Sequence, residues 1–170
     1  MQLIRLAEDY TFGAFDCGES DLNEFLLTDA KDYASQLLAV TYLIESTDGV
    51  VAYFALSNDR ISLSDSDKAT WRRIKKDFPH RKHRNDYPAV KIGRLAVDRR
   101  YQGRQIGTSI LDFVKKTFVT NNRTGCCFIT VDAVPGAVGF YESNGFLLLK
   151  STTAQNAETF PMYYNLRRLA

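Results

Sequence analysis

The chain has 170 residues, of which 45% are hydrophobic, and a formal net charge of +2. These values fit one globular domain over residues 1–170 with a sizeable core. No stretch reaches the roughly 18 apolar residues that a membrane span needs, and no basic N-terminus precedes an apolar run as in a secretory signal. We therefore expect a cytoplasmic protein without a membrane partner.

Cysteine usage argues against covalent cross-links and metal. The three cysteines are Cys17, Cys126 and Cys127, an odd number that includes an adjacent pair. They form no CxxC motif, so neither a disulfide framework nor a zinc site is indicated. We expect reduced, buried thiols and no metal.

Charge is distributed unevenly along the chain. Residues 68–104 contain 13 lysines and arginines but only three aspartates, a local balance of +10 against −8 for the rest. A concentrated positive field attracts anions, such as a phosphorylated cofactor, RNA or an acidic partner. For residues 72–84, which include His80 and His83, a solvated face on a mobile loop is the alternative interpretation.

Local patterns predict the elements near the N-terminus. Residues 3–6 read as a short strand. Residues 20–34 carry apolar side chains at helical spacing, and Asp21 with Glu24 resembles a capping box at the start of that helix.

A hairpin and a basic insertion are expected next. The β-rich runs 38–45 and 50–57 are separated by STDG, which predicts a hairpin. A helix around 65–77 and a polar loop follow, and together they form a basic helix/loop insertion around 65–88. Within that helix, Trp71 either stacks on a nucleobase or anchors its helix on the core.

The second half alternates strands and helices. We expect strands at 89–97, 126–133, 147–150 and 162–168. The run 126–133 is continuously apolar, as buried central strands are. A helix with one apolar face from Ile106 to Phe118 and a short helix starting at Pro135 lie between these strands. The pattern predicts a mixed α/β sheet with helices on both faces.

The segment from Lys91 to Lys116, KIGRLAVDRRYQGRQIGTSILDFVKK, predicts a phosphate-binding loop. A strand–loop–helix binds phosphate because unpaired amides and the helix dipole converge at the helix start. Neither the GxGxxG nor the GxxxxGK[ST] motif is present. The loop contains QGRQIG at 102–107. The strand residues LAV at 95–97 precede it, with four residues between the two motifs.

These residues resemble the GNAT superfamily of acyl-CoA-dependent N-acetyltransferases, whose loop reads Q/R-x-x-G-x-G/A after an LAV strand. The segment FYESNGF at 140–146 resembles a second motif of the same family, so the resemblance covers roughly 89–167. It implies a single-domain mixed, mostly antiparallel sheet flanked by helices on both faces. It also implies acetyl-CoA as co-substrate.

The resemblance also implies the site residues. The cofactor-binding residues would be Leu95, Ala96, Val97, Gln102, Gly103, Arg104, Gln105, Ile106, Gly107 and Thr108. The strand residues would pair with the pantetheine arm and the loop would bind the pyrophosphate. Tyr141 is the candidate general acid, because a phenol of pKa about 10 is protonated at neutral pH; packing in the core is its alternative role. Asp132 and Glu142 are candidate water-mediated bases, with structural roles as the alternative.

Two positions depart from the family pattern. Gln105 stands where a glycine is expected: a negative φ in the first helical turn would cost little, whereas a positive φ would strain it by about 1 kcal/mol. Val134 stands where the family often has an asparagine that caps the next helix or contacts the cofactor.

The acceptor is left open. Residues 15–30 and 53–57 resemble a GNAT subgroup that includes toxins paired with DNA-binding antitoxins, which acetylate the amino group of aminoacyl-tRNA. That reading implies aminoacyl-tRNA as acceptor and an antitoxin as partner. A small amine, peptide or protein amine is the alternative acceptor, and a non-catalytic CoA-binding or interaction module is a further alternative. A homodimer is a candidate assembly.

Overall fold

The computed structural model describes residues 1–78, 84–120, 124–150 and 157–169. His80 and His83 lie outside these ranges. The strands are β1 (Gln2–Arg5), β2 (Val40–Ser46), β3 (Gly49–Ser62), β4 (Asp86–Val97), β5 (Phe128–Ala133), β6 (Leu147–Leu148) and β7 (Phe160–Asn165). The helices are α1 (Ser20–Glu24), α2 (Ala30–Ser35), α3 (Lys68–Lys76), α4 (Ile106–Thr120) and α5 (Val138–Ser143).

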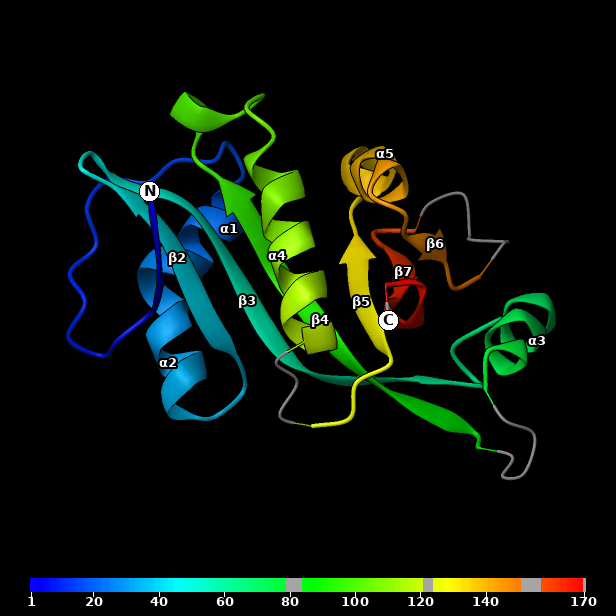
Figure 1. Cartoon of the computed structure of the whole chain (residues 1–170). Coiled ribbons are helices and arrows are strands. Elements are labelled where there is room, and N and C mark those ends of the chain that lie inside the picture. The colour runs from blue at the N-terminus through cyan, green and yellow to red at the C-terminus, as the bar shows by residue number, and fades with distance from the viewer. Residues whose placement is uncertain (79–83, 121–123, 151–156, 170) are drawn as a thin grey trace. The chain divides into compact units, whose positions relative to one another are not determined.

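In the described residues, seven strands form one sheet in the order β1-β2-β3-β4-β5-β7-β6 (Figure 1). The β4–β5 ladder is parallel, whereas β1–β2, β2–β3, β5–β7 and β6–β7 are antiparallel. The predicted mixed, mostly antiparallel sheet with flanking helices is therefore confirmed. Contacts divide the chain into two compact units, and the expectation of one 170-residue domain stays a prediction.

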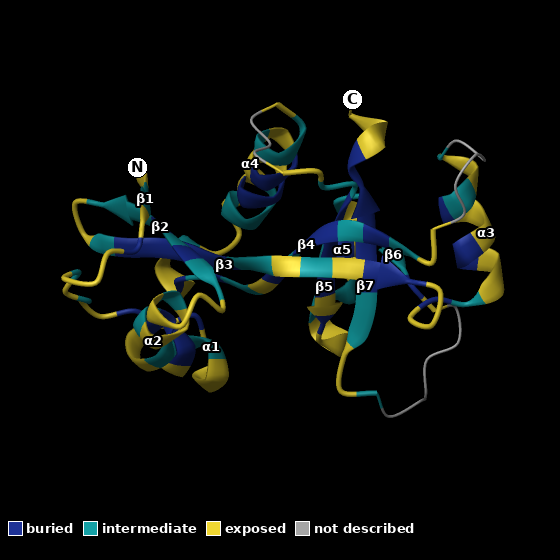
Figure 2. Ribbon diagram, turned by 90° about the horizontal axis from the view of Figure 1, so that it is seen from below, coloured by how far each residue is buried: buried dark blue, intermediate teal, exposed yellow. Residues whose placement is uncertain are grey.

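The first unit comprises Met1–Ser57 and Ile92–Asp112. Its strands β2 and β3 form the predicted hairpin, and α1 and α2 lie along one face while α4 begins on the other (Figure 2). Under α1 and α2, the ring of Phe25 stacks on Tyr53 with centroids 6.0 Å apart, and both side chains are buried.

The helix predicted at 20–34 forms, with a π-helical turn at Phe25–Asp29 joining α1 to α2. The predicted capping box is wrong, because the helix begins at Ser20 and its N-cap residue, Glu19, makes no side-chain capping bond. Asp21 lies instead in the first turn, where the helix dipole favours a carboxylate.

The second unit comprises Asn58–Lys91 and Phe113–Ala170. Strand β5 pairs with β4 on one side and β7 on the other, and five of its six residues are buried. The prediction of a buried central strand is therefore confirmed. Phe128 at its start packs edge-on against Tyr87 and Tyr163, with ring centroids 6.1 and 5.8 Å away.

Helix α3 is anchored on this second core. Asp67 caps its N-terminus by accepting a hydrogen bond from the Thr70 amide at 2.7 Å. Trp71 is only 6% exposed and Ile74 only 1%, and the Trp71 ring lies 5.6 Å from that of Tyr87. Trp71 is therefore the anchor of its helix and is not available to stack on a base. In the part of 72–84 that α3 contains, the basic side chains do form a solvated face, but on a helix and not on a loop.

None of the three cysteines is in a disulfide; Cys17 is buried, and Cys126 and Cys127 are half-buried. Burial raises the pKa of all three thiols, that of Cys126 to about 11. Among the described residues, no three His, Cys, Asp or Glu side chains gather as a metal site would require. In the same residues, no helix combines the length and apolar character of a membrane span.

Candidate active site

The start of α4 carries the predicted phosphate-binding loop, and Gln105 lies just before the helix. Its φ is +60°, in the left-handed region, and its side chain is exposed. The Gln105 carbonyl accepts hydrogen bonds from the Ser109 amide at 3.0 Å and from the Ser109 hydroxyl at 3.1 Å. Gln105 is therefore the N-cap residue of α4 and not part of its first turn. Of the two conformations considered for Gln105, the one with positive φ is present, and it strains the backbone by about 1 kcal/mol.

Four backbone amides are available at this helix start. Because the Ser109 amide makes the first i to i−4 bond, the preceding N–H groups have no intrahelical acceptor. They belong to Gln105, Ile106, Gly107 and Thr108. No acidic residue lies in the first turn, and all four residues are at least partly exposed. The 15-residue helix adds its positive dipole end, so this helix start has the donors and the field to bind an anion.

The loop before α4 is held in place by Asp98, a residue that is only 3% exposed. Its carboxylate accepts from the Arg100 amide and the Arg100 Nε, both at 2.9 Å, and from the Asp16 amide at 3.3 Å. The Arg100 guanidinium holds the pKa of Asp98 below its usual range. Our sequence reasoning counted Asp98 only as a charge, although an aspartate between a strand and a turn is a common cap.

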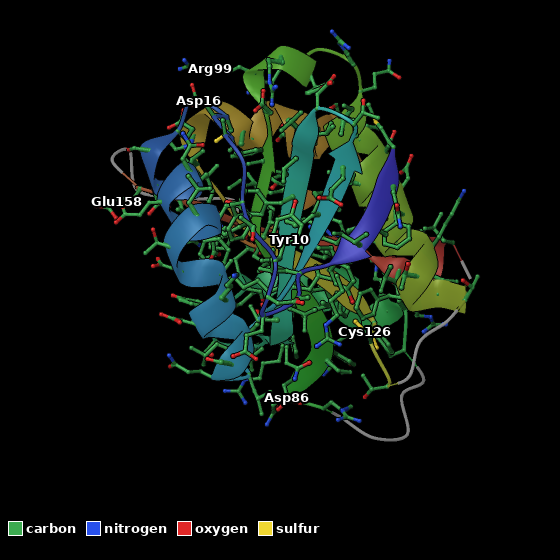
Figure 3. All side chains as sticks on the ribbon, turned by 90° about the vertical axis from the view of Figure 1, so that its left-hand side faces the viewer. Tyr10, Asp16, Asp86, Arg99, Cys126 and Glu158 are labelled. Carbon is green, nitrogen blue, oxygen red and sulfur yellow. The ribbon has the colours of Figure 1, made fainter. Side chains whose placement is uncertain are left out.

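Gln102 closes the loop through its side chain. Its Nε2 donates to the carbonyl of Val97 at 2.9 Å and to that of Cys17 at 2.8 Å. A salt bridge adds a second contact to this loop: Arg99 Nη1 lies 3.2 Å from the Asp16 carboxylate (Figure 3). Gln102 therefore positions the loop, and its side-chain Nε2 is already hydrogen-bonded to these two carbonyls.

Arg104 supplies positive charge beside the free amides. Its guanidinium lies over the ring of Tyr101, 5.3 Å from the centroid, and the side chain is exposed. The Tyr101 hydroxyl lies 3.3 Å from that of Ser46, which fixes the ring. Among the described residues of its unit, no carboxylate pairs with Arg104, so its charge is available to an anion.

Leu95, Ala96 and Val97 lie on the last part of β4. The ladder between β4 and β5 covers only Ala89–Lys91, so within the first unit β4 is the edge strand. Ala96 is buried in the core of this unit, which fixes the strand, and Leu95 and Val97 are half-buried. An edge strand presents backbone donors and acceptors to which an extended ligand can pair.

Tyr141 lies on α5 in the second unit and is 8% exposed. Its ring packs against those of Phe140 and Phe146, with centroids 5.1 and 5.4 Å away. Burial raises the pKa of Tyr141 to about 12. Within the described residues of its own unit, the hydroxyl has no hydrogen-bond partner. The ring is thus part of the core, while the hydroxyl keeps its proton at neutral pH and has it to donate.

The surroundings of α5 clarify three other positions. Val134 is the N-cap residue of a 3₁₀ turn at Pro135–Ala137, where it is 55% exposed and makes no capping bond. Asp132 accepts a hydrogen bond from the ammonium group of Lys91, and Glu142 is exposed. Asp132 therefore has a structural partner, as its alternative role required.

The predicted site residues fall into two groups. All ten predicted cofactor-binding residues lie in the first unit, gathered at the end of β4 and the start of α4. Tyr141 lies in the second unit. A helix start of this kind after an edge strand suits a co-substrate that combines phosphate groups with an extended arm.

The family follows from the chain itself. Residues 81–166, just over half of the chain, match the family model described as an acetyltransferase (GNAT) domain. The chain therefore belongs to the GNAT acetyltransferase family, and acetyl-CoA is its co-substrate. The predicted resemblance is confirmed.

Solved structures share this fold over nearly the whole chain. A mutant of KacT superposes with a TM-score of 0.79 at 22% identity, covering 99% of this chain and 98% of that one. AtaT complexed with acetyl-methionyl-tRNAfMet has a TM-score of 0.75 at 22% identity, covering 99% and 96%. AtaTR bound with acetyl-CoA has a TM-score of 0.75 at 22% identity, covering 99% and 95%.

Proposed function

We propose that this chain is an N-acetyltransferase that moves the acetyl group of acetyl-CoA to the free amino group of an aminoacyl-tRNA, as a toxin. The observation that carries the transferase activity is the set of four free amides at the start of α4, which a short loop joins to the edge strand β4. Arg104 beside them supports the binding of a diphosphate, because amides and a guanidinium are both good phosphate donors.

In the proposed reaction, acetyl-CoA supplies an activated thioester. The amides of Gln105–Thr108 bind the pyrophosphate, and Gln102 holds the loop closed around them. The backbone of Leu95–Val97 pairs with the pantetheine arm, and one of its N–H groups polarises the thioester carbonyl. Tyr141 donates its proton to the departing thiolate.

The amine needs no strong base in this scheme. A free α-amine has a pKa near 8, so a sizeable fraction is already neutral at physiological pH. This suits a chain in which Asp132 is paired with Lys91.

Two observations favour aminoacyl-tRNA as acceptor. Residues 68–104 carry a balance of +10, which suits a polyanion. AtaT, which has the same fold, was solved with acetyl-methionyl-tRNAfMet. A mutant of the toxin AtaT was solved with acetyl-CoA and the C-terminus of the antitoxin AtaR, so we propose an antitoxin as partner here. The site of action would be the cytoplasm, where aminoacyl-tRNA is found.

The test is acetyl transfer from labelled acetyl-CoA to a mixture of charged tRNAs, with Tyr141→Phe as comparison. We expect label on the aminoacyl group with the natural chain and a large loss with the variant. Expression should arrest growth, and Tyr141→Phe should restore it. Normal growth with an enzyme that acetylates a peptide or polyamine panel would point to the alternative acceptor. Tight acetyl-CoA binding without any turnover would point to a non-catalytic module.

A further inference from the structure

Helix α3 presents a row of positive charge on its outer face. Lys68, Arg72 and Lys76 follow one another at four-residue spacing, and all three side chains are exposed. Residues four apart lie on the same face of a helix and are separated by about 6 Å along its axis. The row is therefore linear and extends over two helical turns. Figure 2 shows the exposed and buried faces of α3 as separate sides.

The opposite face holds this row in a fixed position. Trp71 and Ile74 are buried in the core of the second unit. Arg73 Nε donates to the Tyr163 hydroxyl at 3.1 Å, and Asp67 caps the helix start. A ligand that binds the outer face therefore meets side chains whose backbone is already ordered, which lowers the entropy lost on binding.

No ion pair of the described residues neutralises this row. The ion pairs within the described residues use other cations, and none includes Lys68, Arg72 or Lys76. Asp67 and Asp77 lie at the two ends of α3, where Asp67 accepts from the Thr70 amide and Asp77 accepts from Asn165. Three exposed cations outnumber these two carboxylates, so the outer face of α3 is net positive.

We infer that the outer face of α3 binds the phosphate backbone of RNA, and so holds the tRNA body while its aminoacyl end is acetylated. This inference rests on the proposed acceptor. The outer face has no large apolar side chain, whereas protein–protein interfaces have an apolar, aromatic centre. Protein–nucleic acid interfaces are polar and strongly positive. Because Trp71 is buried and cannot stack on a base, the contact is to the backbone and independent of sequence.

The experiment compares two triple variants of equal charge. One replaces Lys68, Arg72 and Lys76 by Gln. Its control replaces Arg5, Lys31 and Lys116 by Gln, which are partly or fully exposed cations on β1, α2 and α4. Binding of uncharged tRNA is measured by fluorescence anisotropy over a range of salt concentrations, with acetyl-CoA affinity and kcat measured alongside.

We expect the α3 variant to weaken tRNA binding at least about tenfold at low salt and to flatten the salt dependence by about one unit of slope per lost contact. Acetyl-CoA affinity and kcat at saturating aminoacyl-tRNA should not change. The control should bind tRNA nearly as well as the natural chain. A single Arg72→Gln variant should lose about one unit of slope, which keeps the test open if the triple variant misfolds.

The two proposals fail separately. Equal tRNA binding by both triple variants, or tRNA displaced as readily by a polyglutamate peptide as by RNA, would overturn the role of α3. The protein could instead bind tRNA through α3 with a strong salt dependence and yet fail to acetylate aminoacyl-tRNA. That result would keep α3 as an RNA-binding surface and overturn the proposal that aminoacyl-tRNA is the acceptor.

Discussion

At the residue scale, Gln105 departs from the family pattern, which has glycine here, and its backbone adopts the left-handed conformation that glycine favours. A glycine would adopt φ = +60° freely, and glutamine does so at a cost of about 1 kcal/mol. The phosphates need the amide of this residue and not its side chain. Because the Gln105 side chain is exposed, the substitution leaves the donor in place and adds only strain.

Gln105→Gly tests this account. Relief of about 1 kcal/mol of strain opposes a loss of about 0.5–1 kcal/mol of backbone entropy, so the two changes nearly cancel. We expect calorimetry to give an acetyl-CoA affinity within about tenfold of the natural chain. Gln105→Val should destabilise the protein, because a β-branched residue is poorly tolerated at positive φ. Hundredfold tighter binding by the glycine variant would show instead that Gln105 damages the site.

Tyr141→Phe separates the two roles of this side chain. The ring contacts with Phe140 and Phe146 are kept, so the free energy of unfolding and the affinity for acetyl-CoA should be nearly unchanged. Loss of the proton donor should lower kcat by about a hundredfold or more. Tyr164→Phe, which alters another buried tyrosine of the same unit, is the control and should keep kcat. If kcat survives in Tyr141→Phe, the residue has a packing role alone.

At the element scale, the loop between β4 and α4 depends on Asp98 for its shape. In Asp98→Ala the amides of Asp16 and Arg100 lose their acceptor. A hydrogen bond contributes about 0.5–1.5 kcal/mol net, so urea unfolding should show a loss of about 1–3 kcal/mol for the two amide bonds together. Acetyl-CoA binding should weaken as well, because the amides of the helix start are no longer held in register. Asp9→Ala, at an exposed position of the same unit, provides a comparison; equal behaviour of the two would argue against a positioning role for Asp98.

Helix α3 depends on Trp71 in a comparable way. Trp71→Ala should remove about 3–5 kcal/mol from the free energy of unfolding, because it leaves a cavity in the core of the second unit. Arg72→Ala, one residue away on the exposed face, should change it by less than about 0.5 kcal/mol. Chemical denaturation followed by circular dichroism measures both. A small effect of Trp71→Ala would mean that α3 is held by its other contacts.

At the scale of the whole molecule, carboxylates set the response to acid. Hydrogen bonds from Asn23, Ser62 and Arg100 lower the pKa values of Asp16, Asp65 and Asp98, respectively. A carboxyl group whose pKa is lower in the folded state contributes stability above its unfolded pKa of about 3.9. That contribution disappears as the pH falls through the folded pKa.

We therefore expect the melting temperature to be nearly constant from pH 8 to about pH 5 and to fall below about pH 4. Asp98→Asn should start from a lower melting temperature and show a smaller decrease in acid, since it has no proton to gain at this position. Differential scanning fluorimetry in a buffer series measures both curves. A parallel decrease in the two proteins would assign the acid sensitivity to other groups.

Local sequence patterns were enough to predict the order and type of most elements, the family and the loop between β4 and α4 as the candidate phosphate-binding segment. Periodicity and glycine placement are local properties, and they survive in the fold because each helix or strand must bury one face. The LAV strand, QGRQIG and FYESNGF could be recognised without any knowledge of contacts.

The roles of individual side chains could be assigned only from the tertiary structure, because the residues that surround each side chain are distant in sequence. Gln102 closes the loop through the carbonyl of Cys17, 85 positions away. Trp71 is an anchor because Tyr87 and the strands of the second unit surround it, and burial in that unit raises the pKa of Tyr141. The sign of φ at Gln105 likewise depends on where the loop joins α4, since glutamine itself favours negative φ.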